Sequence, residues 1–322
     1  MQHYSVPYKT KQFFFVLVKL SIVAGAAYFI YNKLTQNSAL HFSSFVQFTS
    51  KNGVFTLKNI FFLMLLSIFN WFLEILKWQS LVNPIQNINF KNALEQSLGA
   101  LTASLFTPNR IGEYGAKAMY FKVPIRKHIM LVNLMGNMMQ MGITVVLGCI
   151  GLVAVTSTYD IPINYLKIGK FGITVLTLII IAIFVSTQSR LKIKGFSIKR
   201  ISSFILAFPK KKLITGIILA LARYVVFSFQ LFFILQLLQV NLSYIEAMKG
   251  ITTMYLIASV IPSIFIFDVI VKGSVAVYIF SFLGVNPLAV LCATTLMWLL
   301  NFAIPSCFGS FYVLNFKLPK TE

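Results

Sequence analysis

Long apolar segments dominate this sequence and decide what it can fold into. A helix needs about 20 apolar residues to cross the hydrocarbon core of a bilayer. Six segments of the chain meet this requirement without interruption: 12–31, 59–77, 129–155, 168–187, 213–239 and 287–314. The sequence therefore predicts an all-α polytopic membrane protein.

The composition argues against a soluble fold. Of the 322 residues, 58% are hydrophobic and 11% are charged, whereas about 25% are charged in a typical soluble domain. Each hydrophilic gap is shorter than about 30 residues, too short to bury a core of its own, so we expect a single transmembrane domain over residues 1–322. The formal charge of +21 suits loops beside anionic lipid and does not indicate a nucleic-acid partner.

Lysine and arginine set the expected orientation. Segment 188–212 holds eight of them and no acidic residue, which places it on the cytoplasmic side. Following the chain from there puts both termini in the cytoplasm, with 17 of these residues inside and 6 outside. We expect a multi-pass protein of the cytoplasmic (inner) membrane. Segment 12–31 is interpreted as an uncleaved helix, because it is longer than the apolar region of a signal peptide.

Two further apolar regions, 92–121 and 245–283, are each interrupted by a proline followed by charges. They share an order of features: an apolar arm, a proline, an acid, and a lysine four residues after the acid. An acid and a lysine at this spacing lie on one face of a helix. The matching residues are Ala93, Pro108, Glu113 and Lys117 in the first region, and Ala247, Pro262, Asp268 and Lys272 in the second.

This similarity divides the chain into two halves, 12–155 and 168–314. Each half consists of two spans, a broken hairpin and a third span, so three full crossings reverse the orientation of the second half. We predict about six full spans plus two broken, re-entrant hairpins in an inverted repeat, with eight or more helices. Such repeats occur in transporters, where irregular backbone meets near the midplane. Region 245–283 is left open between re-entrant and fully spanning, since both return the chain to the same side.

The charged tips of these hairpins form the candidate site. Pro108 ends the first arm and Gly112 suits a turn, so a second helix is expected to begin near Glu113. The N-terminal amides of that helix would face the tip and favour an anion. Arg110 adds a fork suited to phosphate or carboxylate, and a lipid phosphate is the expected ligand at this depth. Pro262 interrupts the second region in the same way.

Ionisable residues inside apolar segments are costly unless paired or hydrated, so they are the candidate substrate-binding residues. They are Arg110, Glu113, Lys117, Asp268, Lys272, Arg223 and Glu74. The alternative for the hairpin residues is that they pair among themselves and only hold the hairpins. Lys77 and Trp78 are interpreted as anchors at the membrane interface.

Other polar residues have weaker claims. Asn133, Asn137 and Gln140 form a polar stripe on segment 129–155, interpreted first as interhelical hydrogen bonding and second as the lining of a cavity. Gln230, two turns from Arg223, is a weaker binding candidate. The three histidines are scattered along the chain, so we expect neither a metal nor a cofactor.

One segment carries a family resemblance: Thr107-Pro108-Asn109-Arg110-Ile111-Gly112-Glu113-Tyr114-Gly115-Ala116-Lys117-Ala118. It resembles the P-x-R-x-G-E-x-x-R-A motif of the lysylphosphatidylglycerol synthase transmembrane-region family, also called flippase-like membrane proteins. Residues 70–78 resemble the second-helix signature of that family. A later family motif is glycine-rich, and residues 262–268 lack its glycines. The resemblance covers residues 12–315 and implies the translocating membrane unit without the soluble aminoacyl-transferring domain.

The leading hypothesis is a lipid flippase-like transporter that moves a phospholipid or lipid-linked head group across the membrane. Arg110 and Lys272 would meet the phosphate near the midplane, while Glu113 and Asp268 would meet an amine or shuttle protons. The alternatives are a membrane-embedded transferase acting on a lipid-linked substrate, with Glu113 and Asp268 as its carboxylates, and a non-catalytic accessory subunit. The absence of a paired-carboxylate motif disfavours an enzyme. Membrane lipids with an anionic or lipid-linked head group are the expected partners, and the protein partner is left open between a second copy and a lipid-modifying enzyme.

Overall fold

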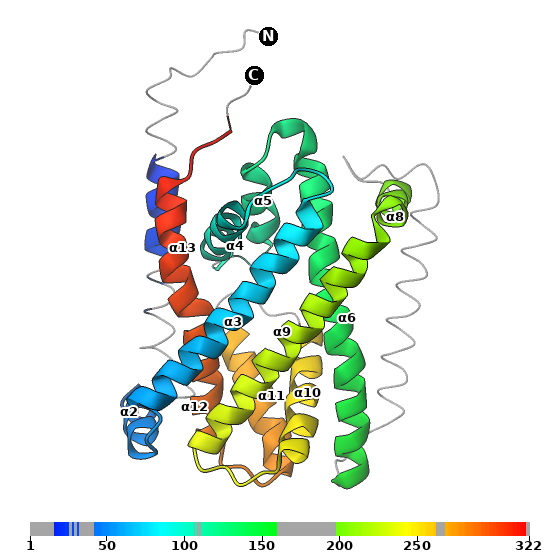
Figure 1. Ribbon diagram of the computed structural model, residues 1–322. Coiled ribbons are helices and arrows are strands. Elements are labelled where there is room, and N and C mark those ends of the chain that lie inside the picture. Colours follow the sequence, from blue (N-terminus) through cyan, green and yellow to red (C-terminus); the bar gives the residue numbers. More distant parts are fainter. Residues whose placement is uncertain are drawn as a thin grey trace.

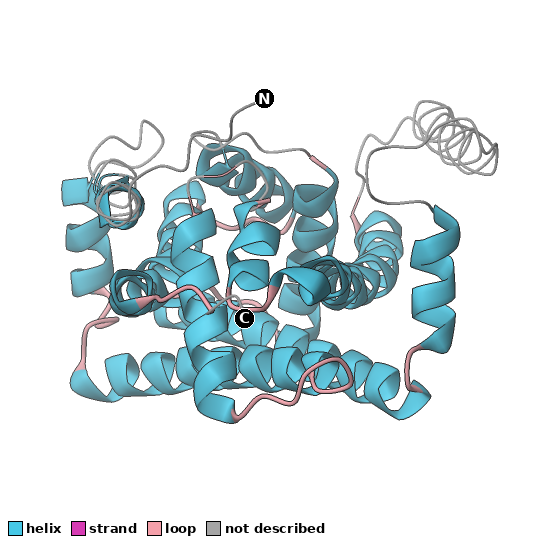
Figure 2. Cartoon of the chain, turned by 90° about the horizontal axis from the view of Figure 1, so that it is seen from above, coloured by secondary structure: helices cyan, strands magenta, loops and turns pink. Residues whose placement is uncertain are grey.

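The described part of the chain is helical and contains no strand (Figure 2). The computed structural model describes residues 16–25, 28, 31, 42–105, 107, 111–159, 198–261 and 268–319, with the backbone alone at 42, 198–202 and 268–271. The predicted span 168–187 lies outside these residues; of the predicted span 12–31, Val16–Gly25 is an apolar helix, and residues 12–15, 26–27 and 29–30 lie outside the described part.

The helices form a bundle with most of its members running lengthwise (Figure 1). Those of the first half are α2 (Phe42–Lys51), α3 (Leu57–Val82), α4 (Phe90–Ser104), α5 (Gly112–Met119), the short 3₁₀ turn η2 (Val123–Ile125) and α6 (Arg126–Thr158). Those of the second half are α8 (Ile198–Ala207), α9 (Lys210–Leu237), α10 (Tyr244–Val260), α11 (Asp268–Phe282), α12 (Pro287–Trp298), the π-helical turn η3 (Leu299–Ala303) and α13 (Ile304–Asn315).

Four helical stretches are long and apolar enough to cross a bilayer: Leu57–Val82, Val123–Thr158, Lys210–Leu237 and Pro287–Asn315. They confirm as helices the predicted spans 59–77, 129–155, 213–239 and 287–314. The shortest has 26 residues, about 39 Å of helix against a hydrocarbon core of about 30 Å.

The outer surface of these helices is apolar. On α6, Val146, Ile150 and Val153 are 59%, 62% and 67% exposed. Soluble monomers rarely expose apolar patches of this kind, whereas lipid tails solvate them without cost. The chain is therefore a helical membrane protein.

Each broken region contains two helices that are shorter than the four long spans. α4 and α5 have 15 and 8 residues, and α10 and α11 have 17 and 15. The pair α4–α5 lies in the upper part of the bundle in Figure 1 and the pair α10–α11 in the lower part. The intervening residues Pro108, Arg110 and Pro262 lie outside the described part of the chain.

Local sequence explains where these helices begin. The Asn89 side chain accepts a hydrogen bond from a first-turn amide and caps α4. Ser243 and Glu246 form a reciprocal capping box at the start of α10. Asn286 caps α12, whose first residue, Pro287, has no N–H to satisfy.

The last span changes helical type midway, at η3. Pro305 lacks an N–H, so the carbonyl of Asn301 loses the donor that a regular helix would supply. The indole N–H of Trp71 on α3 donates to this carbonyl instead, at 3.0 Å. This bond satisfies a backbone group that lipid could not, and it ties the middle of the last span to α3.

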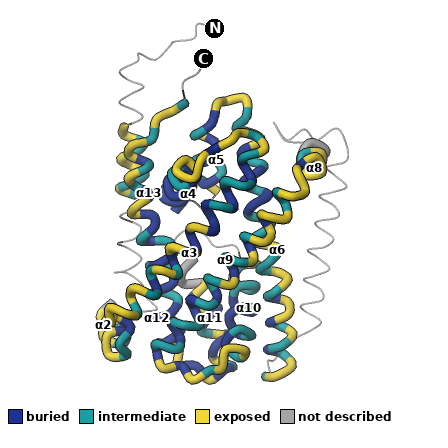
Figure 3. The backbone as a smooth tube through the Cα atoms, in the orientation of Figure 1, coloured by how far each residue is buried: buried dark blue, intermediate teal, exposed yellow. Residues whose placement is uncertain are grey.

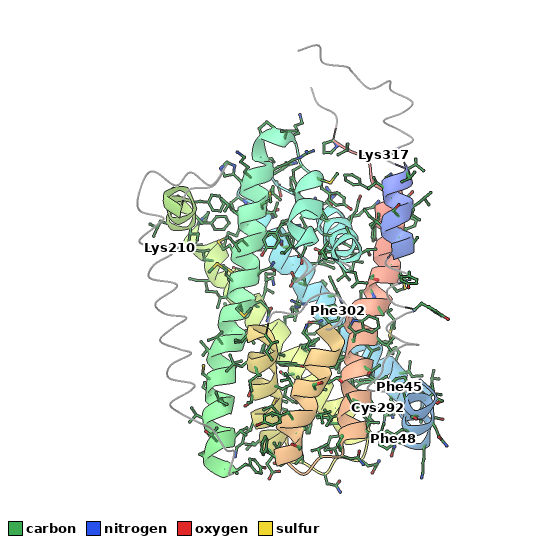
Figure 4. The ribbon with its side chains drawn as sticks, turned by 180° about the vertical axis from the view of Figure 1, so that it is seen from behind. Phe45, Phe48, Lys210, Cys292, Phe302 and Lys317 are labelled. Atoms are coloured by element: carbon green, nitrogen blue, oxygen red, sulfur yellow. The ribbon has the colours of Figure 1, made fainter. Side chains whose placement is uncertain are left out.

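Buried residues follow the centre of the bundle (Figure 3). The largest apolar cluster joins α9, α10, α11 and α12 through residues such as Ile234, Ile251 and Phe280. Phe45 of α2 packs on the same cluster, near Cys292 of α12 (Figure 4). A second cluster, which includes Trp78, joins α3 with α4 and α6.

Candidate functional site

A polar pocket lies inside the bundle where α3, α4, α5, α6 and α9 meet. Its empty space, including the part open to the surroundings, is about 310 Å³. Four of the seven predicted binding residues line it together: Glu74, Glu113, Lys117 and Arg223. The other lining residues are Trp71, Ser97 and Asn137.

One carboxylate in the pocket is shared by two cations. Glu74 Oε2 lies 2.7 Å from Lys77 Nζ and 2.8 Å from Arg223 Nη1. Glu74 and Lys77 are buried, whereas the Arg223 side chain is 19% exposed. The interpretation of Lys77 as an interface anchor is therefore wrong. Lys77 lies on the same face of α3 as Glu74, and that face turns into the bundle.

The second ion pair belongs to α5. Lys117 Nζ lies 2.8 Å from Glu113 Oε1, which is the predicted pairing along one helical face. The same ammonium donates to Asn133 Oδ1 at 2.9 Å and lies 4.2 Å from the ring centre of Trp78. Trp78 is buried and its indole donates to Gln96 Oε1 at 2.8 Å, so it too is not an interface anchor.

The start of α5 requires glycine. The Gly112 amide donates to Thr107 Oγ1 at 3.0 Å. A Cβ at Gly112 would lie 2.8 Å from Thr107 Cγ2 and 3.2 Å from the carbonyl oxygen of Ala103. Because the chain passes this close to the end of α4, α5 begins inside the bundle and Glu113 and Lys117 reach the pocket.

The polar stripe of α6 makes interhelical hydrogen bonds, which confirms the first interpretation of these residues. Asn133 accepts from Lys117, and Asn137 donates to the hydroxyl of Tyr114 on α5 at 3.2 Å. Gln140 donates to a carbonyl of α9 at 3.4 Å. Asn137 also lines the pocket, so the second interpretation holds for that residue.

A chain of buried amides leads away from the pocket. Arg223 Nε donates to Asn70 Oδ1 at 3.1 Å, and Asn70 donates to Asn301 Oδ1 at 2.8 Å. Asn301 donates to Gln230 Oε1 at 2.9 Å, and Gln230 donates to Ser67 Oγ at 2.8 Å. Gln230 thus takes part in a network that joins α3, α9 and the π turn, and it is not among the pocket-lining residues.

Sequence reasoning missed four residues of this site and of its amide network: Trp71, Ser97, Asn70 and Asn301. Asn70 precedes Glu74 by one helical turn, so the shared face was a usable signal. Asn301 is an isolated amide within an apolar span and was usable too. Ser97 gives no signal, because a small hydroxyl is common at helix contacts in membranes.

The predicted site residues of the second hairpin do not join this pocket in the described part of the chain. Lys272 is described and exposed on α11, and it is not among the lining residues. Arg110 and the side chain of Asp268 lie outside the described residues. The meeting of the two hairpin tips stays a prediction. Among the described residues, no three of His, Cys, Asp or Glu are grouped to hold a metal ion.

No protein-family model matches this chain, and no match is found among curated proteins. The resemblance of residues 70–78 and 107–118 to the flippase-like family therefore remains a prediction that rests on those residues alone. The pocket is defined by its lining residues and their contacts, independently of this resemblance.

Proposed function

We propose that this chain is a flippase-like transporter that moves a phospholipid or lipid-linked head group across the membrane, with the pocket between α3, α4, α5, α6 and α9 as its head-group site. The observation that carries this proposal is a cluster of ionised side chains buried in a bundle whose outer face suits lipid. Buried ion pairs stabilise a fold weakly compared with apolar packing. Their presence at this depth favours a ligand that needs them.

An inverted repeat supports alternating access to such a site. The first residues of α4 and α10, Phe90 and Tyr244, are 154 residues apart, as are Pro108 and Pro262. The first residues of α3 and α9 are 153 apart. The two hairpins lie at opposite ends of the bundle in Figure 1, as two halves of opposite orientation require.

Contacts between the halves follow the same relation. α4 of the first half packs on α13 of the second, and α10 of the second half packs on α6 of the first. In both places a glycine meets the hairpin helix. Gly309 of α13 lies against Leu98 and Thr102, and Gly148 of α6 lies against Thr252 and Leu256. The two positions in the second pair are each 154 residues beyond those in the first.

Charge supports an orientation with the upper end of Figure 1 in the cytoplasm. Among the described residues, the basic residues at that end, at the start of α4, in α8 and beside η2, α9 and α13, are Lys19, Lys91, Lys122, Arg126, Lys127, Lys199, Arg200, Lys210, Lys211, Lys212 and Lys317. At the opposite end the described basic residues are Lys51, Lys58 and Lys249. In this orientation the α4–α5 hairpin enters from the cytoplasmic side.

Reconstitution tests the proposal. Purified protein in liposomes should move fluorescent phospholipid between leaflets, and Glu113→Gln should slow this movement at least tenfold, because it removes the partner of buried Lys117. Glu95→Gln is the matched control: Glu95 lies on α4 of the same hairpin but does not line the pocket. We expect the control to stay within about twofold of the unmodified protein, in line with the small effects of substitutions away from such features. Asp268→Asn, tested in parallel, reports on the second hairpin.

The outcomes separate the alternatives. Chemical turnover of a lipid-linked substrate without movement between leaflets would indicate a transferase. Equal movement by the Glu113 and Glu95 variants would show that the pocket is not the route, and no movement by folded unmodified protein would favour an accessory subunit.

A further inference from the structure

In the part of the chain that the structure describes, the pocket and its ion pairs hold more positive than negative charge. Among the described residues the cations are Lys77, Lys117 and Arg223, and the anions are Glu74 and Glu113. Both carboxylates are already engaged by cations at 2.7–2.8 Å. Among the described residues, one positive charge is therefore left without a carboxylate of its own, and an uncompensated charge in a largely buried cluster is unfavourable.

Arg223 is the cation of this cluster that a ligand can reach. Its side chain is 19% exposed, while those of Lys77 and Lys117 are 3% and 2% exposed. Its contacts with described residues use Nε, to Asn70, and Nη1, to Glu74. A guanidinium has five N–H donors in a planar fork, so further donors can meet an anion from the pocket.

Ser97 supplies a second, independent indication of a ligand. It lines the same pocket and is 3% exposed. Its Oγ has no hydrogen-bond partner among the described residues. A buried hydroxyl without a partner is unfavourable inside a membrane protein, and an anionic oxygen in the pocket would accept a hydrogen bond from it.

We infer that the pocket binds a phosphodiester of single negative charge, held between Arg223 and Ser97; this inference rests on the proposed function and narrows its substrate class. A diester contributes one negative charge and balances the cluster. A zwitterionic head group contributes no net charge and leaves the excess in place. A phosphomonoester carries a charge of about −1.5 to −2 at neutral pH, which exceeds the single positive charge to be balanced.

In this assignment the phosphodiester enters the pocket, which is partly open to its surroundings, and the acyl chains of a lipid remain outside, against the apolar surface of the bundle. A diester without acyl chains offers the same chemistry, so the test separates the two sources.

Head-group probes test the preference for a single negative charge, with the full chain in detergent micelles. The probes are glycerophosphoglycerol, a monoanionic diester; glycerophosphocholine, which has no net charge; and glycerol 3-phosphate, a monoester. Binding is measured as the shift in unfolding temperature with probe concentration. We expect the monoanionic diester to bind at least tenfold more tightly than the other two probes.

Variants locate the site. Arg223→Gln should weaken binding of the monoanionic diester about 10- to 100-fold, as expected for loss of a hydrogen-bonded charge. Lys212→Gln makes the same change of charge on the same helix, outside the pocket, and should leave binding unchanged. Ser97→Ala removes a hydroxyl with no partner among the described residues, so it tests the site without breaking an ion pair. We expect it to weaken binding about 3- to 10-fold.

A parallel assay with labelled phosphatidylglycerol and phosphatidylcholine in liposomes separates this inference from the proposed function. Selective probe binding without lipid movement keeps the site and rejects transport of a lipid. Equal movement of both lipids without selective probe binding would support the proposed transport and reject the preference for a single negative charge. Equal binding of all three probes, tightest binding of the monoester, or unchanged binding in both the Arg223 and Ser97 variants would each overturn the inference.

Discussion

Glu74→Gln is expected to destabilise the protein more than any other single change at the pocket, by about 3–5 kcal/mol, the usual cost of removing one partner from a buried ion pair. Glu74 is the carboxylate shared by Lys77 and Arg223. Without it Lys77 stays buried and Arg223 partly buried, with no neutralising partner at that position. The free energy of unfolding, or the unfolding temperature in detergent, measures the loss.

A double variant checks the cause. Glu74→Gln combined with Lys77→Met removes one of the two orphaned cations, and we expect it to recover at least half of the lost stability. Glu95→Gln on α4 is the control for the substitution itself. If Glu74→Gln proves no more damaging than Glu95→Gln, these ion pairs do not hold the bundle together.

The second large effect is expected at the glycines that let the two halves approach each other. A Cβ on Gly309 would overlap the carbonyl oxygen of Leu98 and Oγ1 of Thr102, and a Cβ on Gly148 would overlap Cβ of Leu256. Backbone atoms and a Cβ cannot move aside as a flexible side chain can. Gly309→Ala and Gly148→Ala should therefore each cost about 1–3 kcal/mol, as overpacking does.

α6 supplies its own control for this prediction. Gly142 lies on the same helix as Gly148, and a Cβ there meets nothing within 4 Å. Gly142→Ala should be neutral or stabilising by up to about 1 kcal/mol, since alanine favours the helix. Similar losses at Gly309 and Gly148 would agree with the proposed repeat. A loss at only one of them would count against equivalent contacts in the two halves.

Hydropathy predicted the four described spans because the physics of crossing a bilayer depends on length and composition alone. The paired breaks near Pro108 and Pro262 were predictable for a similar reason, since proline removes a donor wherever it stands. Rotation of a helix about its axis is different. Lys77 and Trp78 lie near an end of α3, where anchors are common, and only packing against α4 and α5 shows that they face inward.

The charged residues of the candidate site were predicted from the sequence, whereas the neutral residues that bond to them were missed. Glu74, Glu113, Lys117 and Arg223 could be selected because ionisable groups are rare inside apolar segments. Asn70 and Asn301 are more than 200 residues apart in sequence and bond across two helices. A single sequence does not show which distant residues are in contact. The carbonyl of Asn301 in the π turn at residues 299–303 likewise accepts from a donor on another helix, the indole of Trp71.

That π turn divides the last span into two helices, α12 and α13. The Trp71 indole, one helical turn from Glu74, bonds the turn to α3, and α13 packs along α4 of the first hairpin. The Trp71–Asn301 bond and the Glu74–Arg223 pair thus share one stretch of α3. A substitution that loosens this stretch is therefore expected to disturb both the pocket and the packing of α13 on α4.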